Sequence, residues 1–207
     1  MTSAIRAKTS HRLLFSAAVV IFVILTVRVF HDETKSEWIA HQRQFQKLFE
    51  QKALEMLAAS SQSGDASAKE NWEKQLQEAR AMRPHLRQIF LPDANVRDLC
   101  TSCHLGIDNP LFADAPEPFR AHPGNLLESH KPDKFGCTVC HHGQGVGTTT
   151  FAAHGLEETW FDPIIPHQYL QATCIGCHET SYGLQGADQF EKGRLVFEKY
   201  GCYDCHS

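Results

Sequence analysis

The chain has 207 residues, of which 42% are hydrophobic and 21% charged, so it is long enough for one modest domain with additional segments. Its net charge of −4 argues against nucleic acid as a partner, because nucleic-acid-binding domains carry a basic surface. Thirteen histidines and eight cysteines stand beside only three methionines. This excess of His and Cys indicates metal or haem ligation rather than ordinary packing.

The N-terminal segment predicts a single membrane span. Residues 13–30 are apolar apart from Arg28, and as a helix they reach about 27 Å, enough to cross a bilayer core. Basic residues within the preceding segment 1–12 favour a cytoplasmic N-terminus. A cleaved signal peptide is the alternative, but no A-x-A-like cleavage site follows the apolar run. We therefore expect an uncleaved anchor in the bacterial inner membrane, contacting the lipid bilayer, with the chain from residue 31 onward in the periplasm.

Residues 31–92 predict a helical hairpin. Candidate capping boxes at 34–37 and 67–70 begin two stretches with apolar residues at helical spacing. A polar run at 60–64 predicts the loop between them. Two roles remain open for this hairpin: a structural stalk, or a docking surface for a partner subunit.

The eight cysteines form four C-x-x-C-H motifs with none left over. The four motifs are Cys100, Cys103 and His104; Cys137, Cys140 and His141; Cys174, Cys177 and His178; Cys202, Cys205 and His206. Two thiols at this spacing can form thioethers with the two vinyl groups of one porphyrin, and the next residue can then ligate the iron. A zinc site, a disulfide or a thioredoxin-like pair needs no histidine after its second cysteine. The pattern therefore predicts four covalently attached haem c groups, with the motif histidines as proximal iron ligands.

From residue 99 to 207 the chain resembles the multihaem c-type cytochromes, on the strength of these four motifs. The resemblance implies a mainly α fold with much irregular structure, in which porphyrins supply most of the apolar core. We expect a transmembrane helix at 13–30, the hairpin at 31–92 and a three-haem region at 93–183. Residues 184–207 are expected to carry the fourth motif.

The first three motifs begin 37 residues apart, which indicates an internal duplication. His130 and His167 each stand seven positions before the next motif's first cysteine, so the unit H-x6-C-x-x-C-H occurs twice. All methionines lie at or before residue 82, which disfavours histidine–methionine ligation. We expect bis-histidine ligation of the first three haems, with His130 and His167 as distal ligands on the basis of the repeat.

Three other histidines are further candidates for distal ligands. His142 directly follows a motif histidine, and in the small periplasmic tetrahaem cytochromes that this resembles, such a residue serves a neighbouring haem. His122 and His154 lie in glycine-containing turns that could present an imidazole to iron. For at least one of the five candidate histidines outside the motifs, the alternative is an ordinary surface histidine. Sequence does not pair any of them with a particular iron.

The fourth motif has a different context. A short amphipathic stretch at 190–201 leads into Cys202, which resembles the opening of a class I monohaem cytochrome c domain. In that family a distal methionine follows some dozens of residues later. We therefore expect the chain to be a fragment of a longer cytochrome; the alternatives are a sixth ligand from elsewhere or none.

These features predict electron transfer rather than catalysis. The leading hypothesis is a respiratory relay between a membrane-bound redox complex, such as a cytochrome b-type or other quinol-oxidising subunit, and a second cytochrome or reductase. The alternative is a quinol dehydrogenase resembling the tetrahaem subunits that serve periplasmic reductases. Those subunits have their first motif close to the membrane span and a methionine where this chain has Gly106. A substrate-converting haem enzyme is a third reading, disfavoured by four regular motifs.

Overall fold

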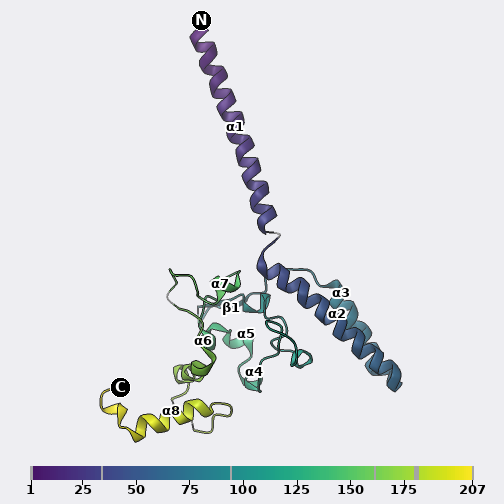
Figure 1. Cartoon of the computed structure of the whole chain (residues 1–207), viewed down its shortest axis with the longest axis vertical. Coiled ribbons are helices and arrows are strands. Elements are labelled where there is room, and N and C mark those ends of the chain that lie inside the picture. Colours follow the sequence, from purple (N-terminus) through teal and green to yellow (C-terminus); the bar gives the residue numbers. More distant parts are fainter. Residues whose placement is uncertain (1, 34, 94, 161, 180–181, 207) are drawn as a thin grey trace.

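The computed structural model describes residues 2–33, 35–93, 95–160, 162–179 and 182–206, with side chains from residue 11 onward apart from residue 33. The described chain is mainly helical. One long helix, α1, projects away from the rest, a helical arm of α2 and α3 extends to one side, and short helices and loops form the remainder (Figure 1).

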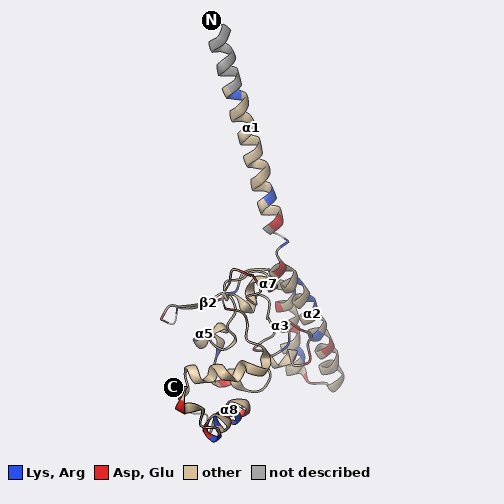
Figure 2. Ribbon diagram, turned by 60° about the vertical axis from the view of Figure 1, so that its left-hand side comes forward, with Lys and Arg blue, Asp and Glu red and all other residues tan. Residues whose placement is uncertain are grey.

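Helix α1 spans Thr2–Glu33 and has the length and apolar character to cross a membrane. Its apolar side chains are largely exposed, as shown by Phe15 at 71% and Phe30 at 71%. Between the blue bands near its two ends the helix carries no charged residue (Figure 2). Such a surface is unfavourable in water and favourable in lipid.

Helices α2 (Glu37–Ser63) and α3 (Ala66–Ala81) form the predicted antiparallel hairpin. The loop is shorter than predicted, because α2 continues through the polar run and ends only where Gly64 adopts a left-handed φ of 72°. The second capping box is also wrong: Asp65, not Ser67, caps α3 by accepting a hydrogen bond from the Ala68 amide at 3.0 Å. Residue 34, which begins the first box, lies outside the described residues.

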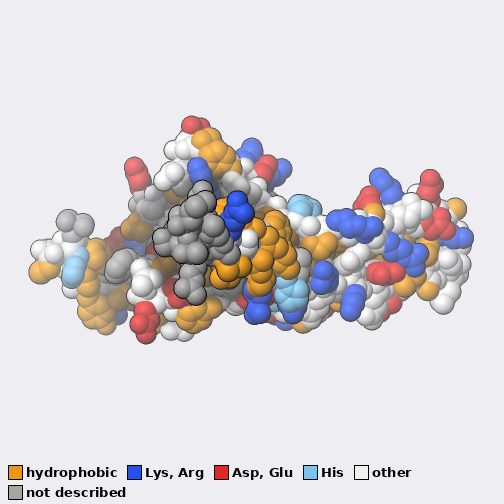
Figure 3. All heavy atoms as spheres, turned by 90° about the horizontal axis from the view of Figure 1, so that it is seen from above, with side chains coloured by type: hydrophobic (Ala, Val, Ile, Leu, Met, Phe, Trp, Pro, Cys, Tyr) orange, Lys and Arg blue, Asp and Glu red, His pale blue; other side chains and the backbone are white. Residues whose placement is uncertain are grey.

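The outer surface of this arm is polar. Lys and Arg side chains are interspersed with Asp and Glu over the face seen from above (Figure 3). Pairs one helical turn apart on α3, Lys69 with Glu73 and Lys74 with Glu78, contribute little stability because they are exposed. The mixed charge is typical of a solvated helical face.

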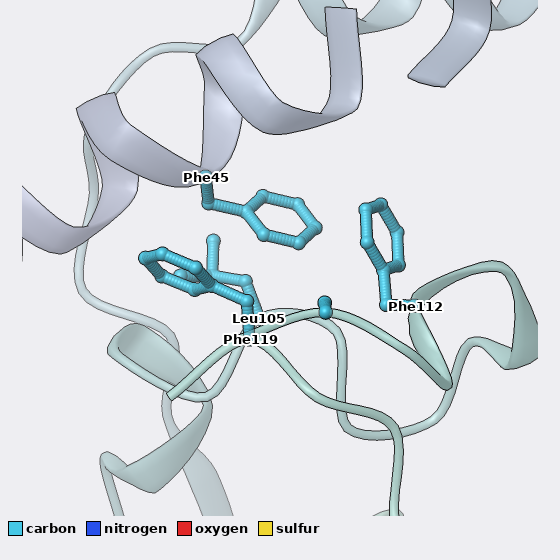
Figure 4. Packing of buried hydrophobic residues seen from close by; sticks show 5 residues of the cluster. Phe45, Leu105, Phe112 and Phe119 are labelled. Carbon is cyan, nitrogen blue, oxygen red and sulfur yellow. The ribbon is translucent and has the colours of Figure 1, made fainter. Parts of the chain in front are cut away.

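An aromatic cluster joins α2 to the segment that follows the first motif. Phe45 of α2 lies 4.7 Å from Phe112 and 5.6 Å from Phe119 between ring centroids, and Leu105 and Ala115 complete the buried set (Figure 4). Burial of three phenylalanines is the largest apolar contribution in this part of the chain. The cluster therefore fixes the arm against the first motif.

The remaining elements are short. A β-hairpin pairs β1 (Ile89–Leu91) with β2 (Val96–Asp98) in antiparallel register, Phe90 opposite Arg97. The 3₁₀ helices are η1 (Cys100–Ser102), η2 (Pro110–Phe112), η3 (His167–Gly176) and η4 (Cys202–Asp204). The α-helices are α4 (Leu126–Ser129), α5 (Pro132–Phe135), α6 (Thr138–His141), α7 (Thr150–Ala153) and α8 (Asp188–Lys199). Helix α8 is the amphipathic stretch predicted before the fourth motif.

The aromatic cluster gives a stability prediction. Phe112→Ala should lower the free energy of unfolding by about 3–5 kcal/mol, because it removes a ring that is 1% exposed and leaves a cavity. Denaturant unfolding of the full chain in detergent measures this change. Phe90→Ala is the matched control. The Phe90 ring is 49% exposed and contacts the Arg97 guanidinium, so its removal should lower the free energy of unfolding by about 1 kcal/mol or less. Equal effects of the two substitutions would contradict the packing described.

Candidate functional site

All four C-x-x-C-H motifs adopt the same local conformation. In each, the histidine amide donates to the carbonyl of the first cysteine four residues earlier, at 2.9 Å for His104, 3.0 Å for His141, 2.9 Å for His178 and 3.0 Å for His206. One helical turn brings positions i, i+3 and i+4 to the same side of the backbone. Each motif therefore directs two thiols and one imidazole toward a common region, as covalent haem attachment requires.

Three motif histidines face a second histidine from elsewhere in the chain. The ring centroids are 6.5 Å apart for His104 and His154, 6.3 Å for His141 and His122, and 6.0 Å for His178 and His130. Two imidazoles on opposite sides of one metal ion, each bonded at about 2.0 Å, have centroids about 6.3 Å apart. The three pairs thus have the spacing of bis-histidine iron sites.

These pairs differ from the assignment that the repeat suggests. His130 precedes the second motif in sequence but faces the histidine of the third. His167 lies close enough to His141 to contribute to its pKa, yet in the described part of the chain the ring that faces His141 is that of His122. Proximity in the fold therefore favours His122, His130 and His154 as the histidines opposite the motif histidines.

His142 has a different environment. Its backbone takes a left-handed φ of 58°, and its Nδ1 lies 2.8 Å from Asp162 Oδ1. A carboxylate at Nδ1 orients an imidazole and leaves Nε2 available, as is common around metal-binding histidines. His206 forms no ring pair with another described histidine, and in this respect the fourth motif differs from the first three.

Burial favours the metal-binding form of two motif histidines. It lowers the pKa of His104, and the neighbouring His154 lowers it further. Burial likewise lowers the pKa of His141, with His122 the next contribution. Both effects favour neutral imidazole, which is the form that binds metal. Among the thiols, burial raises the pKa of Cys103 to about 11.

Consecutive motifs lie next to one another. The Sγ atoms of Cys100 and Cys137 lie within 4.8 Å of each other, which brings motifs one and two together. Helix α6 of the second motif packs on η3, which contains the first cysteine of the third. Gln171 of η3 accepts hydrogen bonds from the amides of Gln189 and Phe190 in α8, which runs toward the fourth motif. The motifs therefore form a continuous series in space.

The motif region buries few of its own apolar side chains. From residue 120 onward, Ala187 is the only buried hydrophobic residue in the described chain. Val139, Ile175 and Tyr203 stand between the two cysteines of motifs two, three and four and are 36%, 66% and 60% exposed. A segment of this length needs another apolar component to form a core. Porphyrins attached at the motifs fit this requirement.

One group of side chains in the described chain could bind a metal ion without haem. It consists of a carboxylate oxygen of Asp98 and the Sγ atoms of Cys100 and Cys137, which lie within 4.8 Å of one another. Such a group could bind a metal ion only through free thiolates. The histidines after both cysteine pairs have no role in this arrangement, so it explains less of the motif than haem attachment does.

Comparison of the chain with known protein families, with curated proteins and with solved structures gives no match.

The ring pairs predict which histidines serve as distal ligands. His122→Ala, His130→Ala and His154→Ala should each convert one haem from low spin to high spin, because each removes one of two imidazoles from an iron. All four haems should remain attached, since attachment uses the cysteines. Absorption and paramagnetic resonance spectra measure the change.

Two further variants make this prediction specific. His85→Ala is the control, because the His85 ring contacts the Arg83 carbonyl and faces none of the motif histidines. His167→Ala separates the two assignments: the repeat predicts a high-spin haem among the first three, and the ring pairs predict none. Wholly low-spin spectra for all three paired variants would contradict the ring-pair assignment.

Proposed function

We propose that the chain is a membrane-anchored multihaem c-type cytochrome that relays electrons from a membrane redox complex to a periplasmic or outer acceptor. The observation that carries the proposal is the set of three histidine pairs at iron-binding spacing, each containing a C-x-x-C-H histidine. A disulfide or a redox dithiol uses neither histidine of these pairs, and a zinc site does not require a histidine directly after the second cysteine in all four motifs.

Four haem c groups are the proposed cofactors. Each would be attached through the two cysteines of its motif, with the motif histidine as proximal ligand. His154, His122 and His130 would be the distal ligands of the first, second and third haem. Haem iron exchanges one electron between the ferric and ferrous states, and the protein sets its potential through ligands, charges and burial.

The folding of the α2–α3 arm supports electron uptake at the first motif. Although many residues separate the membrane span from Cys100, the arm folds back on itself. Gln42, near the start of α2, donates to the Ser102 carbonyl inside the first motif at 3.1 Å. The three residues between α1 and α2 bridge at most about 14 Å. The first motif therefore lies close to the outer end of the proposed membrane span.

A second contact supports the same arrangement. Glu37, the first residue of α2, accepts hydrogen bonds from the amide and hydroxyl of Thr150, the amide at 2.8 Å. These bonds lower the pKa of Glu37. Thr150 begins α7, which leads directly to His154, the ring facing His104. Both imidazoles of the first pair are thus tied to the start of α2.

The proposed route runs from the first motif to the fourth. Consecutive motifs adjoin, and α8 and the C-terminal end of the chain lie far from α1 (Figure 1). Basic residues before the span favour an inner-membrane anchor with the motif region in the periplasm. The donor would be a membrane-bound complex, such as a cytochrome b-type or other quinol-oxidising subunit, and the acceptor a second cytochrome or reductase.

The same geometry keeps direct quinol oxidation as the second candidate. The sequence separates the first motif from the span, unlike in the tetrahaem quinol dehydrogenases, but the folded arm removes most of that separation. In this case the chain would itself be the quinol-oxidising subunit for a periplasmic reductase.

Cofactor content tests the basis of the proposal. The intact mass should exceed that of the polypeptide by four haem masses and should keep this excess after acid extraction. Replacing Cys174 and Cys177 together by Ala should remove one haem and leave three. A polypeptide without covalent haem would overturn the proposal.

A quinol analogue separates the two candidates. Purified oxidised protein mixed with a water-soluble quinol should stay oxidised, and dithionite should then reduce it, because a relay receives its electrons from another protein. Stopped-flow absorption measures the haem reduction. Rapid reduction by the quinol alone, blocked by a quinone-site inhibitor, would replace the relay by a quinol dehydrogenase.

A further inference from the structure

A fully buried carboxylate lies at the junction of the first two motifs. Asp98, at the end of β2, is 0% exposed. Its Oδ2 accepts hydrogen bonds from the amides of Cys137 and Thr138, the second at 3.0 Å, and its Oδ1 accepts one from Thr138 Oγ1 at 2.7 Å. These donors are all neutral, so hydrogen bonds solvate the charge without cancelling it.

The nearest basic residue in sequence does not pair with this carboxylate. The Arg97 guanidinium lies 4.9 Å from the centroid of the Phe90 ring, on the neighbouring strand. No ion pair with Asp98 occurs within the described ranges. Burying a charge without a counter-ion costs free energy of folding, so stabilisation of the fold alone does not explain Asp98 well.

Two glycines enclose the carboxylate. A β-carbon on Gly136 would lie 2.6 Å from Oδ2, and one on Gly145 would overlap Oδ1 and the Arg97 carbonyl. The Leu99 amide donates to the Gly145 carbonyl at 2.6 Å, which closes the backbone around the site. The surroundings thus bring backbone directly against the charge and exclude water from it.

The charge lies beside both sulfur atoms at this junction. A carboxylate oxygen of Asp98, Cys100 Sγ and Cys137 Sγ are mutually within 4.8 Å. In the proposed cytochrome these sulfurs are thioethers bonded to the side chains of two different porphyrins. The edges of the first and second haems would therefore meet at Asp98.

We propose that the Asp98 carboxylate lowers the reduction potentials of the first two haems, an inference that rests on the proposed function. Ferric haem carries one more positive charge than ferrous haem, so a nearby negative charge stabilises the oxidised form. The effect is strong in a dry site because little solvent screens it, and it decreases with distance. The third and fourth haems are attached further along the series and are affected less.

Asp98→Asn tests the role of the charge with little change in structure. The Asn oxygen can accept from the amides of Cys137 and Thr138, and its amide group can donate to Thr138 Oγ1, so all three hydrogen bonds can be kept. Potentiometric titration should show two midpoint potentials rising and two nearly unchanged. His154→Ala and His122→Ala, which alter the first and second haems, identify which midpoints belong to them.

Thr138→Val is the matched variant, because it keeps the charge and removes one donor to it. With less solvation of the carboxylate, the same two midpoints should fall. Unchanged midpoints in Asp98→Asn, with four haems attached and low-spin spectra retained, would overturn the proposal. A rise in Thr138→Val would also overturn it, since a negative charge with one hydrogen-bond donor fewer should lower the potential, not raise it.

The mass of each sample separates this inference from the proposed function. If the wild-type protein carries no covalent haem, both the proposed function and the role of Asp98 are wrong. Wild-type protein with four haems and an Asp98→Asn variant with unshifted potentials removes only the role of Asp98. If Asp98→Asn does not fold, the sign of the shift in Thr138→Val decides: a fall supports the inference, and a rise or no change overturns it.

Discussion

The distance between paired imidazoles is the constraint on which the rest of this chain depends. Separations of 6.0–6.5 Å between ring centroids occur three times, and each pair joins two segments that are not adjacent in sequence. Few apolar side chains hold these segments together after Phe119. The short helices, the 3₁₀ turns and the glycine-rich loops are therefore best understood as connections between ring positions, since their own packing energy is small.

The part of the chain nearest the proposed membrane is held by ordinary packing instead. Phe45, Phe112 and Phe119 form a buried cluster, and Gln42 makes hydrogen bonds to both His85 and Ser102. Rigid support of this kind keeps the first motif at a fixed place relative to α2. An electron carrier needs such a fixed position on the side that faces its donor, because small changes in geometry alter the transfer step.

Sequence reasoning located the motif residues and the amphipathic helices, and it named the three ring partners among five candidate histidines, but it did not assign a partner to each motif histidine. The C-x-x-C-H spacing acts within one helical turn, so local sequence determines it. The α2–α3 hairpin follows from helical periodicity, and only its loop and its cap at Asp65 were misplaced. The partner of His178 depends on contacts between distant parts of the sequence. His130 precedes the second motif in the repeat, but in the folded chain its ring lies opposite His178 of the third motif. Asp98 was missed because a single acidic residue before a motif carries no periodic signal.

The two histidines of each ring pair are separated in sequence by parts of other pairs, and this order affects how the protein would be assembled. If the chain is exported in sequence order from residue 31 onward, His122 emerges before His141, so the second pair is complete as soon as its own motif emerges. The first pair must wait for His154, which emerges only after the whole second motif, while His130 is already present when His178 arrives. The iron sites of the proposed cytochrome would thus mature in the order second, first, third. The motif nearest the membrane would stay open to the haem-attachment machinery longer than its place in the chain suggests.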